Sequence, residues 1–394
     1  MGIDDKIVED RKFVKLVNKI TPVAMALMCL LGVTYLAAGQ LVLPNDSGVS
    51  TEDCTSLDTY FEVVRDNGSL ENITLPGTYE QYEEEELILT TTLTPEVFGE
   101  WLMVWNMGHE MSVYVNDELR LKVDNEGRRL FPGDVAYQFD FVNLKEADAG
   151  QTLSIHFPKY QEENRHLGSV YIGDKAALVL KAVRPYQFPL FLGIAMVVIG
   201  IVTMIRLRFF RRETTYELFY MCLGVTISSA WFLFNSPAAQ FIFPNVETAK
   251  DCAFIFAAMI PMPFLMYVGR LFRGRYSLIL AILKICSTVS FFYLMIGFLF
   301  TDLSLNGLFI PTEISAVAGL GITFALITGD IQNRRIREYY LAAIGITCFI
   351  ALALLYVILF ILFPFRGDSG SLLMAGIICL YFLSMTSYYK KKDR

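Results

Sequence analysis

Histidine is scarce in this 394-residue chain, and its placement excludes several kinds of chemistry from the most apolar part. The three histidines, His109, His156 and His166, all precede the long apolar runs that begin near residue 186. Intramembrane acyl transfer or hydrolysis generally needs a histidine, a Ser–His pair or a metal cluster. We therefore expect no catalytic centre in the apolar runs, and histidines so widely separated do not predict a metal site elsewhere.

Recognisable catalytic motifs are missing as well. The chain has no Gly-x-Ser-x-Gly, no His-Glu-x-x-His, no glycine-rich phosphate loop with lysine and no paired-cysteine motif. Of the seven cysteines, only Cys54 lies between residues 44 and 184, so no disulfide framework is expected there. A bridge from Cys54 to Cys252 is a less favoured alternative. We predict that the chain is not an enzyme and needs no cofactor and no metal.

What the chain does contain is a series of apolar runs, each about as long as a bilayer is thick. About 20 helical residues cross a hydrocarbon layer of roughly 30 Å, and lipid cannot satisfy exposed backbone groups, so we expect helices. The sequence predicts a bundle of seven helices over residues 185–389. The runs are Tyr186–Leu207, Tyr216–Phe234, Ala253–Phe272, Leu278–Phe300, Leu308–Thr328, Leu341–Leu362 and Leu372–Tyr388.

A further apolar run covers residues 21–43 after a polar, mixed-charge segment at residues 1–20. It is long enough to span as a signal-anchor helix. It also carries Ala37-Ala38-Gly39, an acceptable cleavage site for a signal peptide. We favour the anchor, which gives eight helices, and either outcome leaves the following segment on the outside.

Basic residues set the predicted orientation, because cytoplasmic connections are enriched in Lys and Arg. One side of the helices, with the tail at residues 390–394, carries fourteen such residues and the other side carries two, Lys250 and Arg366. The fourteen are Arg206, Arg208, Arg211, Arg212, Arg270, Arg273, Arg275, Arg334, Arg335, Arg337, Lys390, Lys391, Lys392 and Arg394. We predict a multi-pass protein of the plasma (inner) membrane with a cytoplasmic C-terminus.

Residues 44–184 form the predicted extracytoplasmic domain. They hold 26 Asp and Glu against 11 Lys and Arg, which argues against nucleic acid as a ligand. Short alternating runs predict about ten strands, including one over Ala176–Leu180, and Asn116-Asp117 predicts a hairpin turn. We expect an all-β sandwich of two sheets, of the jelly-roll kind, inserted between the anchor and the seven helices.

This order resembles the bacterial seven-transmembrane receptors with diverse intracellular signalling modules, and in particular the sensory half of membrane diguanylate cyclases. Three external stretches, Ser112–Leu119, Glu146–Leu153 and Tyr171–Leu178, are similar to the carbohydrate-binding-like sandwich of these receptors. In the helices, Ala230–Leu233 and Met259–Phe264 are similar to their second and third block helices. The resemblance covers nearly the whole chain.

The resemblance implies a bacterial receptor in cyclic di-GMP signalling that forms a homodimer and acts on a cytoplasmic effector. The sequence departs from the family because it stops at Arg394 without the Gly-Gly-(Asp/Glu)-Glu-Phe motif of a cyclase. Either a longer parent chain carries the effector, or a partner supplies it.

Candidate ligand-binding residues lie in the predicted sandwich. Trp101 and Trp105 project from the same face of one strand, and the ring faces could stack on a sugar if that face is not the core. His109 follows this strand, and Arg165 and His166 precede the last strands, which makes them candidate rim contacts. The expected ligand is a small molecule, a glycan or a protein.

Three residues in the apolar runs are candidates for intramembrane coupling. Glu313 lies about a turn and a half inside the outer face, where a carboxylate is costly. Pro261 and Pro263 fall in the middle of the third run, where proline favours a kink. Lys284 is expected to extend its ammonium group toward the cytoplasmic surface.

The sequence thus predicts a transmembrane receptor that binds an external ligand and relays its state through the helices to the effector. A transporter or permease with an external accessory domain, and an adaptor for assembly of the cell envelope, remain alternatives from other classes.

Overall fold

The structure is a computed structural model of residues 1–394. It describes residues 13, 16, 17, 20, 52–57, 61–64, 70–80, 86–94, 100–124, 135–158, 164–209, 216–301, 305–333, 335–336, 339–362 and 370–392. The predicted anchor at residues 21–43 lies outside these described residues.

The chain divides into two compact units, and the division differs from the predicted domain boundaries. One unit comprises residues 39–187 together with residues 237–249, and the other comprises residues 1–38, 188–236 and 250–394. The predicted sandwich domain ended at residue 184, and its second piece from the helical part of the chain was not predicted.

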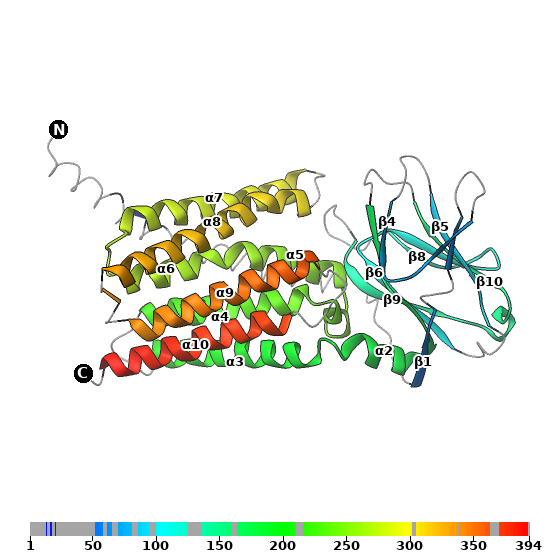
Figure 1. The fold of residues 1–394 in the computed structure, drawn as a ribbon, viewed down its shortest axis with the longest axis horizontal. Helices are drawn as coiled ribbons and strands as arrows, with labels where there is room; N and C mark the ends of the chain where they lie inside the picture. Colours follow the sequence, from blue (N-terminus) through cyan, green and yellow to red (C-terminus); the bar gives the residue numbers. More distant parts are fainter. Residues whose placement is uncertain are drawn as a thin grey trace. The chain divides into compact units, whose positions relative to one another are not determined.

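The first unit is a two-sheet β-sandwich (Figure 1). One sheet has the strand order β1-β12-β6-β9 and the other β3-β2-β5-β10-β7-β8, while β11 pairs with β4. The strands are β1 (Glu52–Ser56), β2 (Phe61–Val64), β3 (Leu70–Ile73), β4 (Gly77–Glu80), β5 (Leu87–Thr92), β6 (Trp101–Met107), β7 (Met111–Val115), β8 (Glu118–Val123), β9 (Tyr137–Asn143), β10 (Thr152–Phe157), β11 (Asn164–Leu167) and β12 (Val170–Asp174).

Alternation along the strands places one face of each sheet in a shared core. In β10, Leu153 and Ile155 are fully buried, and in β6 Leu102 and Val104 are buried in the same cluster. The predicted hairpin is confirmed between β7 and β8, where Asn116 and Asp117 have φ of 48° and 62°. Asn and Asp tolerate this left-handed conformation because their short polar side chains bond locally.

The predicted strand over Ala176–Leu180 is wrong. These residues lie in a helix, α2 (Lys175–Val183), which buries Ala176, Leu178 and Ala182. Alanine, leucine and lysine are strong helix formers, and this local preference prevailed over the short apolar run. The sandwich therefore does not pass directly from its last strand into the first apolar helix.

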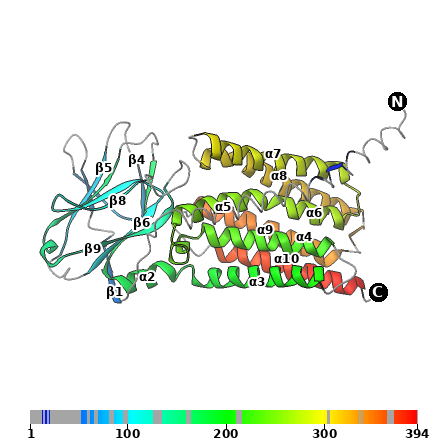
Figure 2. The same cartoon turned by 180° about the vertical axis from the view of Figure 1, so that it is seen from behind.

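The second unit is helical, and Figures 1 and 2 both show α7 beside α8 and α9 beside α10. The helices that follow α2 are α3 (Gln187–Phe209), α4 (Tyr216–Asn235), α5 (Val246–Met259), α6 (Pro261–Leu271), α7 (Ser277–Phe300), α8 (Leu305–Gln332), α9 (Tyr340–Leu362) and α10 (Gly370–Lys392). The N-terminal residues of α5 belong to the sandwich unit and the remainder to the helical unit.

Within the residues that the structure describes, five helical segments are long and apolar enough to cross a membrane, namely 187–208, 216–235, 246–271, 277–300 and 307–332. In α9 and α10 the apolar segments among the described residues are shorter, Tyr340–Tyr356 and Leu372–Tyr388. The chain thus combines a β-sheet domain with several apolar helices of membrane-spanning length. The count of seven spans stays a prediction.

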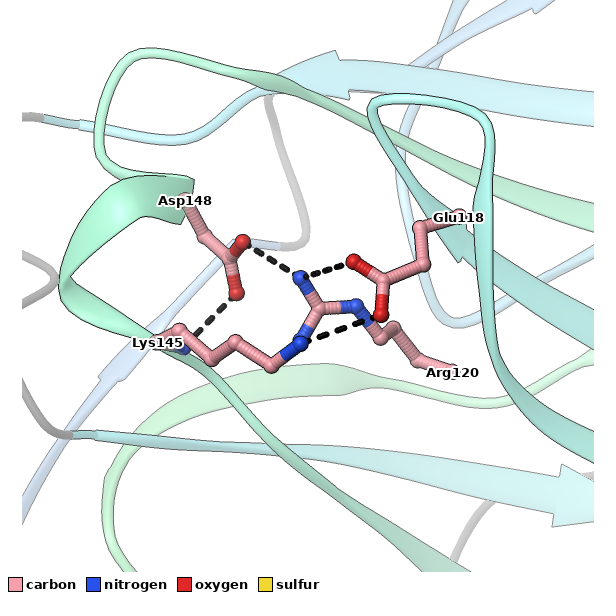
Figure 3. Close-up of polar contacts among 4 residues, drawn as sticks. All are labelled: Glu118, Arg120, Lys145 and Asp148. Carbon is pink, nitrogen blue, oxygen red and sulfur yellow. Dashed lines mark hydrogen bonds and ion pairs between the residues drawn. The ribbon is translucent and has the colours of Figure 1, made fainter.

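Ion pairs join β8 to the turn between β9 and β10 (Figure 3). The Arg120 guanidinium lies 2.6 Å from an Asp148 oxygen and 3.1 Å from a Glu118 oxygen. The second Asp148 oxygen accepts the backbone N–H of Lys145 at 2.7 Å, and the Lys145 ammonium lies 3.0 Å from Glu118. The hydrogen bond from Lys145 lowers the pKa of Glu118 below its usual value of 4.5, with the charges of Arg120 and Lys145 adding to the shift.

Glu118→Gln tests this pKa shift through the pH dependence of stability. Because the folded-state pKa is lowered, the charged carboxylate stabilises the fold above its unfolded-state pKa. That contribution disappears as the pH falls through the lower folded-state value. We expect wild type to be slightly more stable than Glu118→Gln at pH 7, and the two to converge once the pH falls below the folded-state pKa.

Denaturant unfolding of the full chain in detergent, followed by tryptophan fluorescence, measures this difference. Glu146→Gln, on an exposed glutamate of the neighbouring 3-10 turn η1 (Glu146–Asp148), is the matched control. A difference between wild type and Glu118→Gln that stays constant from pH 7 to about pH 3 would contradict the assignment.

Candidate functional site

The two predicted tryptophans lie on the outer face of the four-stranded sheet. Leu102 and Val104 of β6 face the core, so Trp101, Met103 and Trp105 face the opposite side. Other side chains of the same unit cover part of this outer face. The Trp105 ring stacks on Phe139 of β9 with ring centres 6.1 Å apart, and Met103 is only 1% exposed.

The aromatic stacking continues into the segment between α4 and α5. Phe139 stacks on Phe241, with ring centres 6.4 Å apart, and Phe241 lies at the end of a 3-10 turn, η2 (Pro237–Phe241). At the other end of β6, the ammonium group of Lys175 lies 4.0 Å from the centre of the Trp101 ring. Both predicted stacking residues thus have ring or cation contacts within the chain, and their ligand-binding role stays a prediction.

The structure brings Trp105, His109 and His166 together. These residues line a narrow hollow at the end of the sandwich core, together with Leu89, Phe157 and Gly168 among others. The His109 Nε2 atom lies 3.1 Å from the carbonyl oxygen of His166, and His166 Nδ1 lies 2.8 Å from the Thr78 hydroxyl. The space is comparable to a single water molecule, so it holds no larger ligand in this conformation.

Glycine at position 168 is a steric requirement of this hollow. A Cβ atom there would lie 2.1 Å from the carbonyl oxygen of Trp105, well inside van der Waals contact. The turn between β11 and β12 therefore lies so close to the backbone of β6 that no side chain fits at position 168. Arg165 lies in β11 opposite Tyr79, but its side chain lies outside the described residues. Trp101 stands four residues before Trp105 on β6 and does not line the hollow.

A buried polar cluster beside this hollow was not predicted. Asp140 accepts hydrogen bonds from the amide groups of Gln138, at 2.6 Å, and Asn106, at 3.1 Å. The Asn106 side chain also bonds both ways with the backbone of His109, each at 2.8 Å. These side chains fix the turn that carries His109. The sequence did contain an indication of this cluster, because polar residues interrupt two otherwise apolar strands at core-facing positions. These residues are Asn106, Gln138 and Asp140.

The edge of the four-stranded sheet is closed by a side chain from the segment between α4 and α5. The amide oxygen of Gln240 accepts the Phe139 N–H at 2.6 Å, and its amide nitrogen donates to the Phe139 carbonyl at 2.9 Å. Gln240 thus pairs with the backbone of Phe139 as a residue of a neighbouring strand would. Glu247, 2% exposed, accepts the N–H of Ala136 at 2.9 Å just before the same strand.

These contacts explain why residues 237–249 belong to the sandwich unit. Asn245 accepts the Thr248 N–H at 2.6 Å with its side-chain oxygen, which caps the start of α5. The helix therefore begins within the segment that β9 holds.

The predicted coupling residues in the helices have different outcomes. The helix is interrupted for one residue at the prolines, since α5 ends at Met259 and α6 begins at Pro261, with Pro263 buried two residues later. A kink and a coupling role for these prolines stay predictions. Glu313 is an exposed residue of α8, so no packing within the described chain buries it. The prediction that Lys284 extends to the cytoplasmic surface is wrong. The side chain is 5% exposed, and its ammonium group lies near Gly269.

Asp330 is a buried carboxylate near the end of α8 that was not predicted from the sequence. It forms an ion pair with Arg275 at 2.9 Å and accepts hydrogen bonds from Tyr276, at 2.9 Å, and from Tyr339. The bond to Asp330 raises the pKa of Tyr276, because phenolate would face the carboxylate. The sequence did contain an indication of this cluster. Asp330 follows directly after an apolar run, and the connections between the runs contain arginines and tyrosines that could pair with it.

Among the described residues, no group of three His, Cys, Asp or Glu side chains is arranged to hold a metal ion. Cys54 and Cys252 are both free thiols, so the alternative bridge between them is not present.

Together, the β-sandwich and the five long apolar helices among the described residues define a membrane protein. Its β-domain includes a segment, residues 237–249, that lies between apolar helices in the sequence. No known protein family matches the chain, and no curated protein matches it. Among solved structures, one match is a GH31 alpha-xylosidase from Xanthomonas citri, 10% identical with a TM-score of 0.17. That match covers 35% of this chain and 20% of the enzyme.

Gln240→Ala is expected to open the edge of β9. Each lost hydrogen bond to the backbone costs about 1 kcal/mol, so amide hydrogen exchange at Phe139 should accelerate by roughly fivefold to tenfold. Gln240→Glu should give a smaller effect on the N–H, because a carboxylate still accepts but cannot donate to the Phe139 carbonyl. Hydrogen exchange with mass spectrometry on the full chain measures both.

Asn143→Ala, an exposed position at the end of the same strand, is the control and should leave exchange at Phe139 unchanged. If Gln240→Ala also leaves it unchanged, the amide of Gln240 does not protect this edge.

Proposed function

We propose that this protein is a membrane receptor whose sandwich binds an external ligand and relays its state through the helices to a cytoplasmic effector. In this proposal the sandwich lies outside the cell, the basic connections lie in the cytoplasm, and the effector is either a further module or a partner protein. The distribution of lysine and arginine supports this orientation. A glycan or another small polar molecule is the proposed ligand class.

The observation that carries the proposal is the attachment of residues 237–249 to the sandwich. Gln240, Phe241 and Glu247 hold the segment between α4 and α5 on β9, through paired backbone bonds, ring stacking and a buried carboxylate. In the described part of the chain, it therefore crosses between the units at residues 187–188, 236–237 and 249–250. A sheet joined to the helices at several points transmits a change of shape better than one joined by a single linker.

Ligand binding would act on this attachment through the aromatic side chains on the same face of the four-stranded sheet. Trp105 stacks on Phe139, and Phe139 stacks on Phe241, so a ligand that displaces Trp105 also shifts the contact with η2. The hollow between Trp105, His109 and His166 is the proposed entry point, which the ligand must widen. Signalling then requires that the ligand bind the open and closed arrangements with different affinity.

The double variant Gln240→Ala, Phe241→Ala tests the relay without knowledge of the ligand. Thr386 is an exposed residue of α10 and is replaced by cysteine as a reporter. If two copies associate and the attachment sets the position of α10, the rate of disulfide cross-linking between copies should change by about fivefold. Cross-linking is measured on the full chain in native-like membranes.

Leu119→Ala, an exposed position on β8, is the matched control in the sandwich. An unchanged rate in the double variant, with the fold intact by hydrogen exchange, would contradict the relay. Solute flux into liposomes that contain the purified protein would instead favour a transporter.

A further inference from the structure

One face of helix α2 is buried and the other is exposed. The buried face packs on β1, β12 and β6 of the sandwich. The exposed side chains are Leu180, Lys181 and Arg184, whose spacing of three and four residues places them side by side. Arg184 directly follows the helix and still donates its N–H to the Leu180 carbonyl at 2.8 Å. These three residues form the α2 face, and because Leu180 is 62% exposed, the face combines an apolar side chain with two cations.

The charge of this segment is opposite to that of the domain to which it belongs. Residues 44–184 contain 26 Asp and Glu against 11 Lys and Arg. Residues 175–184 contain three of these cations and no acidic residue, and the next acidic residue along the chain is Glu213. An anionic surface therefore repels most of the domain and attracts this segment.

Chain connectivity places the α2 face close to the beginning of an apolar helix of membrane-spanning length. The apolar segment begins at Gln187, three residues after Arg184. Three residues cover at most about 11 Å when fully extended, and the headgroup layer of a bilayer is roughly 5–8 Å thick on each side. Long basic side chains extend several ångströms further, so Arg184 and Lys181 lie within reach of lipid phosphates.

We propose that the α2 face binds the phosphate groups of anionic phospholipids at the surface of the membrane that contains α3. In this arrangement Arg184 and Lys181 contact the phosphates, and Leu180 contacts the boundary between headgroups and acyl chains. The occupant is a lipid and not a dissolved anion, because lipid phosphates are always present beside the start of a spanning helix. The proposal depends on the membrane position of α3 and not on the proposed receptor function.

The basic side chains suit this role for different reasons. A guanidinium group such as that of Arg184 binds phosphate oxygens through two parallel N–H bonds, and an ammonium group binds as a point charge. The Lys181 ammonium lies 4.3 Å from the centre of the Tyr171 ring on β12. This contact holds the lysine in place and reduces the entropy that it loses on binding phosphate. Tyrosine is itself enriched at the level of the lipid headgroups.

Hydrogen exchange of the full chain in nanodiscs tests the lipid contact. One preparation contains phosphatidylcholine alone, and the other contains equal parts of phosphatidylcholine and phosphatidylglycerol. The amides of α2 should exchange about fivefold more slowly in the anionic nanodiscs, because a cation near an anionic surface stabilises the bound helix by an equivalent factor. The double variant Lys181→Gln, Arg184→Gln should lose this difference between the two lipids.

The matched controls keep the charge or remove it elsewhere. The double variant Lys181→Arg, Arg184→Lys should retain the slower exchange in anionic nanodiscs. Lys122→Gln, on a lysine of β8 that is 57% exposed, should retain it as well. Raising sodium chloride to about 1 M shortens the screening length to roughly 3 Å and should reduce the slowing in wild type. The amides of β10 should exchange equally in both lipids.

Three results would overturn the proposal. Wild-type α2 could exchange equally in both lipids, which would mean that no anionic lipid binds there. The glutamine variant could accelerate exchange equally in both lipids, which would mean that the cations only stabilise the end of the helix. Inorganic phosphate could reproduce the slowing in phosphatidylcholine nanodiscs, which would identify a site for a dissolved anion. The cross-linking experiment on the sandwich attachment does not involve the α2 face, so each proposal can fail while the other holds.

Discussion

An exposed strand edge has unpaired N–H and C=O groups, and their partners here determine which segment of the chain belongs to the β-domain. Here the edge of β9 is closed by a glutamine that lies far along the chain, between two apolar helices. A water molecule would satisfy the same backbone groups, but it would leave the helical connection independent of the sheet. Because the side chain of Gln240 forms these bonds, residues 237–249 between the apolar helices belong to the β-domain.

Polar groups in buried positions recur at the places where segments distant in sequence are joined. Asp140 in the sandwich fixes the turn that bears His109, and Asp330 in the helices fixes two interhelical connections. A buried charge is stable only when donors surround it, so such a residue restricts the chain around it to few arrangements. The apolar contacts of the core and the helices supply burial, while these carboxylates determine which segments meet.

The sequence predicted the elements whose patterns are local. The strands predicted over residues 101–107 and 152–157 have the observed bounds of β6 and β10, and the seven apolar runs after residue 185 lie largely in helices of the described part of the chain. The short strands β1, β4 and β11 were missed because their residues are mostly polar and show no apolar alternation. The role of Gln240 could not be predicted, since nothing in its neighbourhood indicates a partner one hundred residues earlier. Asp330 was missed for a similar reason, because its donors come from separate connections.

The division of the chain inside α5 has a consequence for recombination between genes. A β-domain encoded by one continuous stretch can be exchanged as a cassette, but this one consists of residues 39–187 and residues 237–249. Transfer of the first piece alone would leave Phe139 without Gln240 and Phe241. A functional chimera must therefore carry both pieces, with the two apolar helices between them, or supply an equivalent cap from the recipient bundle.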